Sequence, residues 1–144
     1  MSQGVLVIIH SDECGTCRIL KHRGFFDQLV DHLDVEDVYT LELEKSGPSG
    51  QAKIFDVDHW YPNFKFMSKD TYQRAIKSGQ DWMSVYDDIR MFNRVEVNGE
   101  LKPSNTYPGF TLEYIQEFCD DAQESLGLKP STATTSSSLA LYTD

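Results

Sequence analysis

The chain reads GVLVIIH at residues 4–10, SDE at residues 11–13 and C-G-T-C at residues 14–17, and this run carries the strongest signals for its fold. The first seven residues form an apolar, β-branched run without alternation, which is typical of an interior parallel strand buried on both faces. After the C-G-T-C motif, apolar residues recur at helical spacing, at Ile19, Leu20, Phe26, Leu29, Val30 and Leu33. We therefore predict that Cys14 and Cys17 lie at a strand-to-helix junction.

The next part of the chain supplies two more strands and a short helix. Residues 38–44, VYTLELE, alternate apolar and polar side chains and predict a strand with one wetter face, which completes a β-α-β unit. A Gly/Pro/Ser break at residues 46–50 precedes a short helix over residues 52–57. A further strand is predicted directly after Pro62, where a proline removes no ladder donor.

The second half of the chain predicts helices around a hairpin. Residues 68–91 have apolar residues at helical spacing, interrupted at Ser78-Gly79, and predict two short helices that form an insertion. Asn98-Gly99 is a type I′ hairpin signal, which predicts an antiparallel pair of strands. A last helix is predicted over residues 110–126. We predict one domain over residues 1–128 and a disordered Ser/Thr-rich tail over residues 129–144.

Charge and composition exclude several classes of protein. The chain has 144 residues, of which 13 are basic and 23 acidic, and its net charge is −10. This excess repels phosphate backbones and anionic membrane surfaces, so we expect neither nucleic acid nor membrane as a partner. No apolar run approaches the roughly 20 residues of a membrane span, and no secretory signal is visible. Three cysteines, an odd count, favour a reducing compartment, so we expect a soluble, cytoplasmic protein.

The C-G-T-C motif is suited to redox chemistry at the predicted junction. The partial positive charge of a helix N-terminus stabilises a thiolate, so we expect Cys14 to be the attacking thiol. Cys17, in the first helical turn, is close enough to form a disulfide with Cys14 and is expected to be the resolving thiol. Gly15 leaves the approach to the Cys14 sulfur uncrowded.

Four neighbouring residues are candidates for tuning the Cys14 thiolate. Arg18 is the nearest cation in sequence, whereas Asp12 and Glu13 are anions that oppose thiolate formation. These signs conflict, so the sequence predicts no reduction potential. His10, between the strand and the turn, is a candidate for proton transfer from Cys17, and the alternative is a purely structural histidine.

Two other interpretations of the cysteine pair remain open. A C-x-x-C can be half of a zinc site, which needs two more ligands. The candidates are scattered along the chain, at His10, His22, His32, His59 and Cys119, and no second C-x-x-C exists. We therefore predict no metal, and we expect Cys119 to be a buried small hydrophobe. The remaining alternative is a redox-inert module that binds a protein partner.

Two motifs in this order, C-G-T-C-R at residues 14–18 and AKIFDVDHWYPNFKF at residues 52–66, resemble thioredoxins and the thioredoxin-like domains of protein disulfide isomerases. The resemblance implies an α/β, thioredoxin-like fold with a central four-stranded mixed sheet flanked by helices. It also implies a cis-proline at Pro62, with Pro108 as a weaker rival. Tyr61, before that proline, would pair through its backbone with an extended substrate chain, next to Gly15 and Thr16.

By the same resemblance, the chain is a thiol–disulfide oxidoreductase that acts on protein disulfides and needs no cofactor. A thioredoxin reductase or glutathione are the candidate partners that would recharge the pair. The sequence departs from the family at three positions. Ile8 stands where thioredoxins hold a buried carboxylate, Glu13 replaces an aromatic residue, and Asn63 replaces the threonine after the proline.

Overall fold

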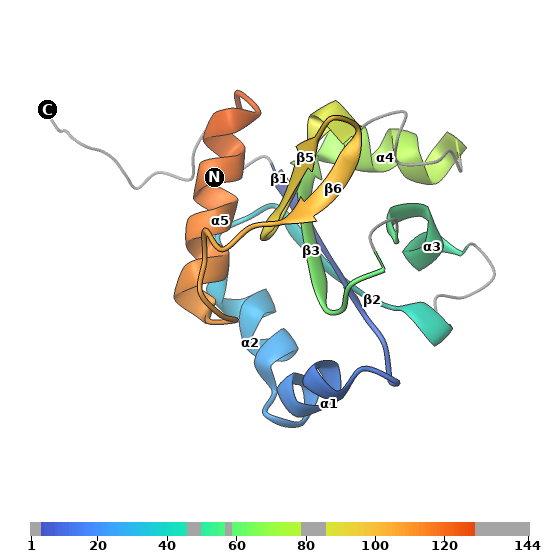
Figure 1. Ribbon diagram of the computed structural model, residues 1–144, viewed down its shortest axis with the longest axis vertical. Helices are drawn as coiled ribbons and strands as arrows, with labels where there is room; N and C mark the ends of the chain where they lie inside the picture. Colours follow the sequence, from blue (N-terminus) through green and yellow to red (C-terminus); the bar gives the residue numbers. More distant parts are fainter. Residues whose placement is uncertain (1–3, 46–49, 57–58, 79–85, 129–144) are drawn as a thin grey trace, which may run out of the picture.

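Strand β1 (Gly4–His10) is buried along its whole length and lies between β2 (Asp37–Glu42) and β3 (Asn63–Ser68) (Figure 1). It pairs parallel with β2 and antiparallel with β3, and β4 (Ile89–Met91) pairs antiparallel with β3 at the edge of the sheet. The computed structural model describes residues 4–45, 50–56, 59–78 and 86–128. Over these residues the chain is α/β, with a four-stranded mixed sheet flanked by helices, as the resemblance implies.

Helices cover both faces of the sheet (Figure 1). The covering pairs are α2 (Phe25–His32) with α5 (Leu112–Ser125), and α3 (Gln51–Phe55) with α4 (Lys69–Ser78). Helix α1 (Gly15–His22) lies at the end of the sheet where β1 stops, and two 3-10 turns span Leu43–Lys45 and Tyr86–Asp88. None of the helices in the described segments combines the length and the apolar character that a membrane crossing requires.

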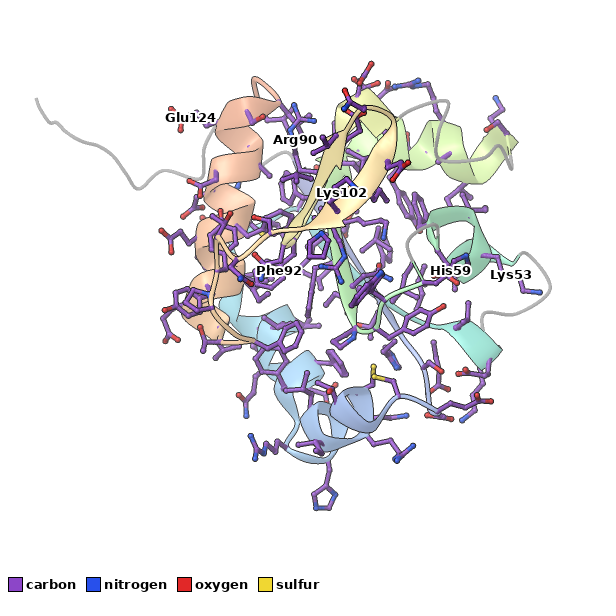
Figure 2. The ribbon with its side chains drawn as sticks, viewed as in Figure 1. Lys53, His59, Arg90, Phe92, Lys102 and Glu124 are labelled. Carbon is purple, nitrogen blue, oxygen red and sulfur yellow. The ribbon has the colours of Figure 1, made fainter. Side chains whose placement is uncertain are left out.

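The two faces of β1 build two separate cores. Leu6 and Ile8 point to the face that α2 and α5 cover, where they meet Phe64 and Phe66 of β3. Phe92 lies between the strands and α5 (Figure 2), and its ring contacts that of Phe64 with a centroid separation of 5.4 Å. Phe64 and Phe66 share this face, and the strand predicted directly after Pro62 is confirmed.

The opposite face is closed by α3 and α4. The Tyr72 ring of α4 stacks on Tyr39 of β2 at a centroid separation of 4.7 Å and on Phe55 of α3 at 5.7 Å. These three rings join both helices to the edge strand. The β1 residues on this face are Val5, Val7 and Ile9. The burial predicted for both faces of residues 4–10 is therefore confirmed.

The predicted hairpin forms a small sheet of its own. Strands β5 (Arg94–Val97) and β6 (Glu100–Pro103) pair antiparallel across Asn98 and Gly99. Both turn residues have positive φ, 53° and 83°, as a type I′ turn requires. The turn prediction is confirmed, but this pair does not join the central sheet.

The fourth strand of the central sheet corrects the prediction for residues 68–91. Helix α4 confirms the first predicted helix, but residues 89–91, predicted as helical, form β4, while residues 79–85 lie outside the described residues. Ile89 is buried opposite Met67, and the Phe92 N–H donates to the Phe64 carbonyl over 2.9 Å. A three-residue strand is too short to show a period of two. The predicted tail, residues 129–144, also lies outside the described part.

The helix predicted after the cysteine motif is divided into α1 and α2. Gly24 adopts φ 74°, a left-handed conformation that ends one helix and begins the next. Ile19 and Val30, two of the apolar residues that recur at helical spacing, are 55% and 51% exposed. The bend lets α2 pack on the sheet while α1 stays at its end.

Gly4 is the position at which the start of β1 tolerates no side chain. A Cβ built there would lie 1.7 Å from Cζ of the fully buried Phe66 ring. We expect Gly4→Ala to lower the free energy of unfolding by about 1–3 kcal/mol, because the ring must move within a packed core. Urea denaturation measures this change. Gly15→Ala is the matched control, since its Cβ meets nothing within 4 Å; equal losses in the two variants would contradict the prediction.

Candidate functional site

Cys14 is the N-cap residue of α1, at the strand-to-helix junction that the sequence predicts. Its sulfur accepts a hydrogen bond from the Cys17 N–H over 3.2 Å, and its own N–H donates to the Ser11 carbonyl over 3.1 Å. The Cys14 side chain is half-buried, whereas Gly15 and Thr16 are exposed. The sulfur therefore receives a backbone donor from the first helical turn and still reaches the surface.

Cys17 lies beneath Cys14 and is 2% exposed. Burial, and then a hydrogen bond with the Cys14 side chain, raise the pKa of Cys17 to about 12, although a backbone hydrogen bond with Ser11 acts in the opposite direction. Both cysteines are free thiols. Cys17 is thus a protonated thiol at neutral pH, held next to a more accessible partner.

The segment before β3 brings the second predicted motif to the cysteines. The Tyr61–Pro62 peptide bond is cis, and the Cys14 thiol donates to the Tyr61 carbonyl oxygen over 3.3 Å, across 47 residues of sequence. Pro62 is buried, and Pro108, its rival, has no cis bond before it in the described residues. The expectation of a cis-proline at Pro62 is confirmed, and Tyr61 joins the cysteine pair.

Hydrogen bonds to Glu44 hold the loop between β1 and α1. Its carboxylate accepts from the Ser11 hydroxyl and, over 3.1 Å, from the Asp12 N–H. These two bonds lower the pKa of Glu44. The Glu13 N–H donates to the Ser11 hydroxyl oxygen over 3.2 Å, and the Glu13 side chain is exposed. The loop that carries Cys14 is therefore anchored to the turn that follows β2.

Two lysines balance the acidic charge beside the cysteines. Lys21 and Lys45 lie 3.7 Å and 3.6 Å from the Asp12 carboxylate, and each lies 3.2 Å from Glu42. Hydrogen bonding with Asp12, and then with Lys21 and Lys45, lowers the pKa of Glu42 to about 2. Arg18 donates to the Asp12 carbonyl over 2.8 Å. Because Asp12 is paired, its field at Cys14 is weaker than its sequence position suggests.

His10 ends β1 in a buried position. Its Nδ1 lies 3.8 Å from the Glu42 carboxylate, and its ring stacks on Phe26 with a centroid separation of 4.9 Å. Burial lowers the pKa of His10 below 6.5. These contacts are those of a packed structural histidine, and proton transfer with Cys17 stays a prediction.

Asn63 and Lys65 are buried polar residues that the sequence analysis did not identify as part of the site. Lys65 is 0% exposed, and its Nζ donates to Asn63 Oδ1 over 2.8 Å. Asn63, 6% exposed, donates from Nδ2 to the Trp60 carbonyl over 2.9 Å. A lysine in a strand usually points to solvent. One sequence signal could have indicated that Asn63 and Lys65 are buried. The strand that contains them belongs to a sheet predicted to have helices on both faces, so neither face of this strand is open to solvent.

The residues considered for zinc are not grouped with the cysteine pair. His22 and His32 are exposed, and His59 lies beside α3 (Figure 2), with Nδ1 3.4 Å from Asp56. Cys119 is fully buried in the core, as predicted, and burial raises its pKa. In the parts of the chain that the structure describes, no three Cys, His, Asp or Glu side chains are arranged to hold a metal ion.

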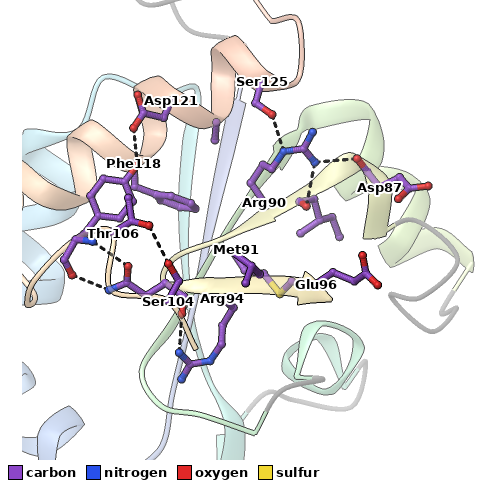
Figure 3. A pocket seen from close by; sticks show the side chains of 15 residues that line it. Asp87, Arg90, Met91, Arg94, Glu96, Ser104, Thr106, Phe118, Asp121 and Ser125 are labelled. Carbon is purple, nitrogen blue, oxygen red and sulfur yellow. Dashed lines mark hydrogen bonds between the residues drawn. The ribbon is translucent and has the colours of Figure 1, made fainter. Parts of the chain in front are cut away.

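A cavity of about 440 Å³ lies between β4, β5 and α5 (Figure 3). Arg90 lines it and donates from Nε to the Ser125 hydroxyl over 2.8 Å. Tyr107 also lines it and donates to the Asp121 carboxylate; burial, and then this bond, raise the pKa of Tyr107. Neither cysteine of the pair lines this cavity. The cysteine pair therefore lies outside this cavity.

The difference between the thiols predicts a sharp order of alkylation. With iodoacetamide at pH 8, we expect the half-buried Cys14 to react first. Cys17, with a pKa of about 12, should react at least about 100-fold more slowly, since only a small fraction is thiolate. Peptide mass spectrometry assigns the labelled residue, and Cys14→Ser is the control that should remove the fast phase. Cys17 labelling as fast as Cys14 would contradict this order.

Comparison with known proteins gives no relative on which to base an assignment. Neither protein-family models, nor curated proteins, nor solved structures match the chain. What can be said of its chemistry therefore comes from the residues and geometry described above.

Proposed function

We propose that the chain is a thioredoxin-like thiol–disulfide oxidoreductase that acts on disulfides of proteins. One arrangement supports this function above all others. The accessible Cys14 at a helix N-terminus, the buried Cys17 three residues later and the Tyr61 carbonyl before a cis-proline converge on one point. A structural cysteine pair has no need of a partly accessible member facing such a carbonyl.

The exchange needs only the two thiols and the substrate disulfide. The Cys14 thiolate attacks one sulfur of the substrate, the substrate S–S bond breaks, and the released sulfur takes up a proton. Cys17 then gives up its proton and attacks the Cys14 sulfur of the mixed disulfide. The bond to the substrate breaks, a second substrate thiol is released, and a Cys14–Cys17 disulfide remains. Two electrons pass from the dithiol to the substrate, and no cofactor takes part.

Formation of the mixed disulfide removes one of the interactions that raise the pKa of Cys17. Burial and the hydrogen bond with Cys14 keep Cys17 protonated in the reduced protein. Once Cys14 is bonded to a substrate, its thiol no longer forms the hydrogen bond that raises the pKa of Cys17. The backbone hydrogen bond with Ser11, which favours the Cys17 thiolate, is still available. The second attack is thus favoured only after the first.

The substrate is proposed to be an extended chain. The Tyr61 backbone lies beside the half-buried Cys14 sulfur, and Gly15 and Thr16, the two residues that follow Cys14, are exposed. An extended peptide can add to such a backbone by strand pairing, which favours protein disulfides over small ones. A thioredoxin reductase or glutathione would restore the dithiol, and a reducing compartment such as the cytoplasm suits the free thiols.

Insulin reduction tests the proposed function. With a dithiol reductant present, we expect the wild type to accelerate precipitation of the insulin B chain, and Cys14→Ser to abolish the acceleration. Cys17→Ser should accumulate a mixed disulfide with the substrate, visible on a non-reducing gel, because the resolving thiol is missing. Activity unchanged in Cys14→Ser would contradict the mechanism.

A redox titration separates exchange from a redox-inert binding module. We expect the Cys14–Cys17 disulfide to form within about −320 to −120 mV, the span of known dithiol proteins. Mass spectrometry after thiol labelling follows the oxidised fraction at each potential, and Cys119, buried in the core, should stay reduced throughout. A pair that never oxidises in this interval would favour the redox-inert module.

A further inference from the structure

Lys65 is an unusual residue for the middle of a sheet. It is 0% exposed and lies on β3 opposite Val7 of β1 and Met91 of β4, on the face that α3 and α4 cover. Burying an amino group among apolar side chains costs free energy unless the group is hydrogen-bonded. An apolar residue of the same length would fill this position at a lower cost in free energy. A role for the Lys65 amine must therefore come from the hydrogen bonds that it makes.

The Lys65 amine is bonded toward the cysteine site. Its Nζ donates to Asn63 Oδ1 over 2.8 Å, and this contact leaves Asn63 Nδ2 directed at the Trp60 carbonyl, 2.9 Å away. Asn63 is itself only 6% exposed. Lys65 thus orients the amide of Asn63, and Asn63 ties the backbone at Trp60 to the interior of the sheet.

The tied backbone is the one that faces Cys14. Trp60 immediately precedes Tyr61, whose carbonyl accepts from the Cys14 thiol over 3.3 Å. Two successive carbonyls of this segment are therefore held, the first from inside by Asn63 and the second at the thiol. A rotation of the Trp60–Tyr61 backbone that freed the first carbonyl would also move the second.

We propose that Asn63 and Lys65 are positioning residues that hold the 60–62 segment in the orientation needed to pair with a substrate strand. This inference rests on the proposed function. Strand pairing requires backbone donors and acceptors at set positions, and a misplacement of about 1 Å can cost a large factor in rate. A small disulfide that makes no strand contact has no such requirement, so the two residues affect protein disulfides selectively.

Two variants separate this role from general stability. Asn63→Asp keeps the size of the side chain and an acceptor for Lys65 but removes the donor to the Trp60 carbonyl. Lys65→Met keeps the length of the side chain and removes the amine. We expect each to slow insulin reduction by about tenfold, the order of one hydrogen bond to a charged or oriented group, while reduction of the small aromatic disulfide DTNB changes less than about twofold.

Met67→Leu is the matched control, because Met67 is also fully buried on the same face of β3 and is an apolar member of its core. It should leave the ratio of the insulin and DTNB rates unchanged even if it lowers stability. An unchanged ratio in both Asn63→Asp and Lys65→Met, with an active wild type, would overturn the positioning role and leave the proposed function standing.

Amide hydrogen exchange tests the Lys65–Asn63 and Asn63–Trp60 hydrogen bonds in the absence of substrate. In the peptide covering residues 59–63, we expect Asn63→Asp and Lys65→Met to exchange about tenfold faster than the wild type, as one lost hydrogen bond predicts, and Met67→Leu to match it. Unchanged exchange in both variants would overturn the proposal. If the two variants exchange faster but the wild type reduces neither insulin nor DTNB, the result would support the role of Asn63 and Lys65 in holding residues 60–62. The same result would contradict the proposed function.

Discussion

Strand β1 is buried on both faces, and this burial dictates where the neighbouring strands and the helices lie. A strand with no solvent face must be paired on both edges and covered by helices on both sides, and β2, β3 and the four covering helices meet this requirement. The polar residues 11–13 that follow β1 can therefore leave the sheet only at its end, where α1 begins with Cys14 as its N-cap. The position of the half-buried Cys14 thiol at the start of α1 is thus a consequence of the buried strand.

The same pairing brings the second half of the site to the first. Asn63 pairs with Ile9 near the end of β1, so the segment before β3 must lie beside the loop that leads to Cys14. The Tyr61 carbonyl reaches the Cys14 thiol for this reason. A single register therefore joins two motifs that are far apart in the sequence, and this is the geometry that supports the proposed exchange.

Features that span many residues or have a strong local cause were predictable, and short or purely tertiary ones were not. The β1 run, the helix start at Cys14 and the Asn98-Gly99 turn each have a direct physical signal. The strand β4 was predicted as helix, since three residues carry no period and only pairing with β3 makes them a strand. Gly24 divides one predicted helix into two, because packing of α2 on the sheet outweighs continuity of the helical pattern.

The order of most strands and helices, the junction that carries Cys14 and the strand after Pro62 could be predicted from the sequence, because each has a signal in a short run of residues. The groups that surround the thiols could not: the lysines beside Asp12, the burial of Cys17, and the contact between Lys65 and Asn63. Burial and charge pairing depend on segments that are distant in the sequence. The local sequence Phe64-Lys65-Phe66 is compatible with a strand at the surface and with a strand between two layers of helices. The burial of Lys65 is therefore visible only in the folded protein.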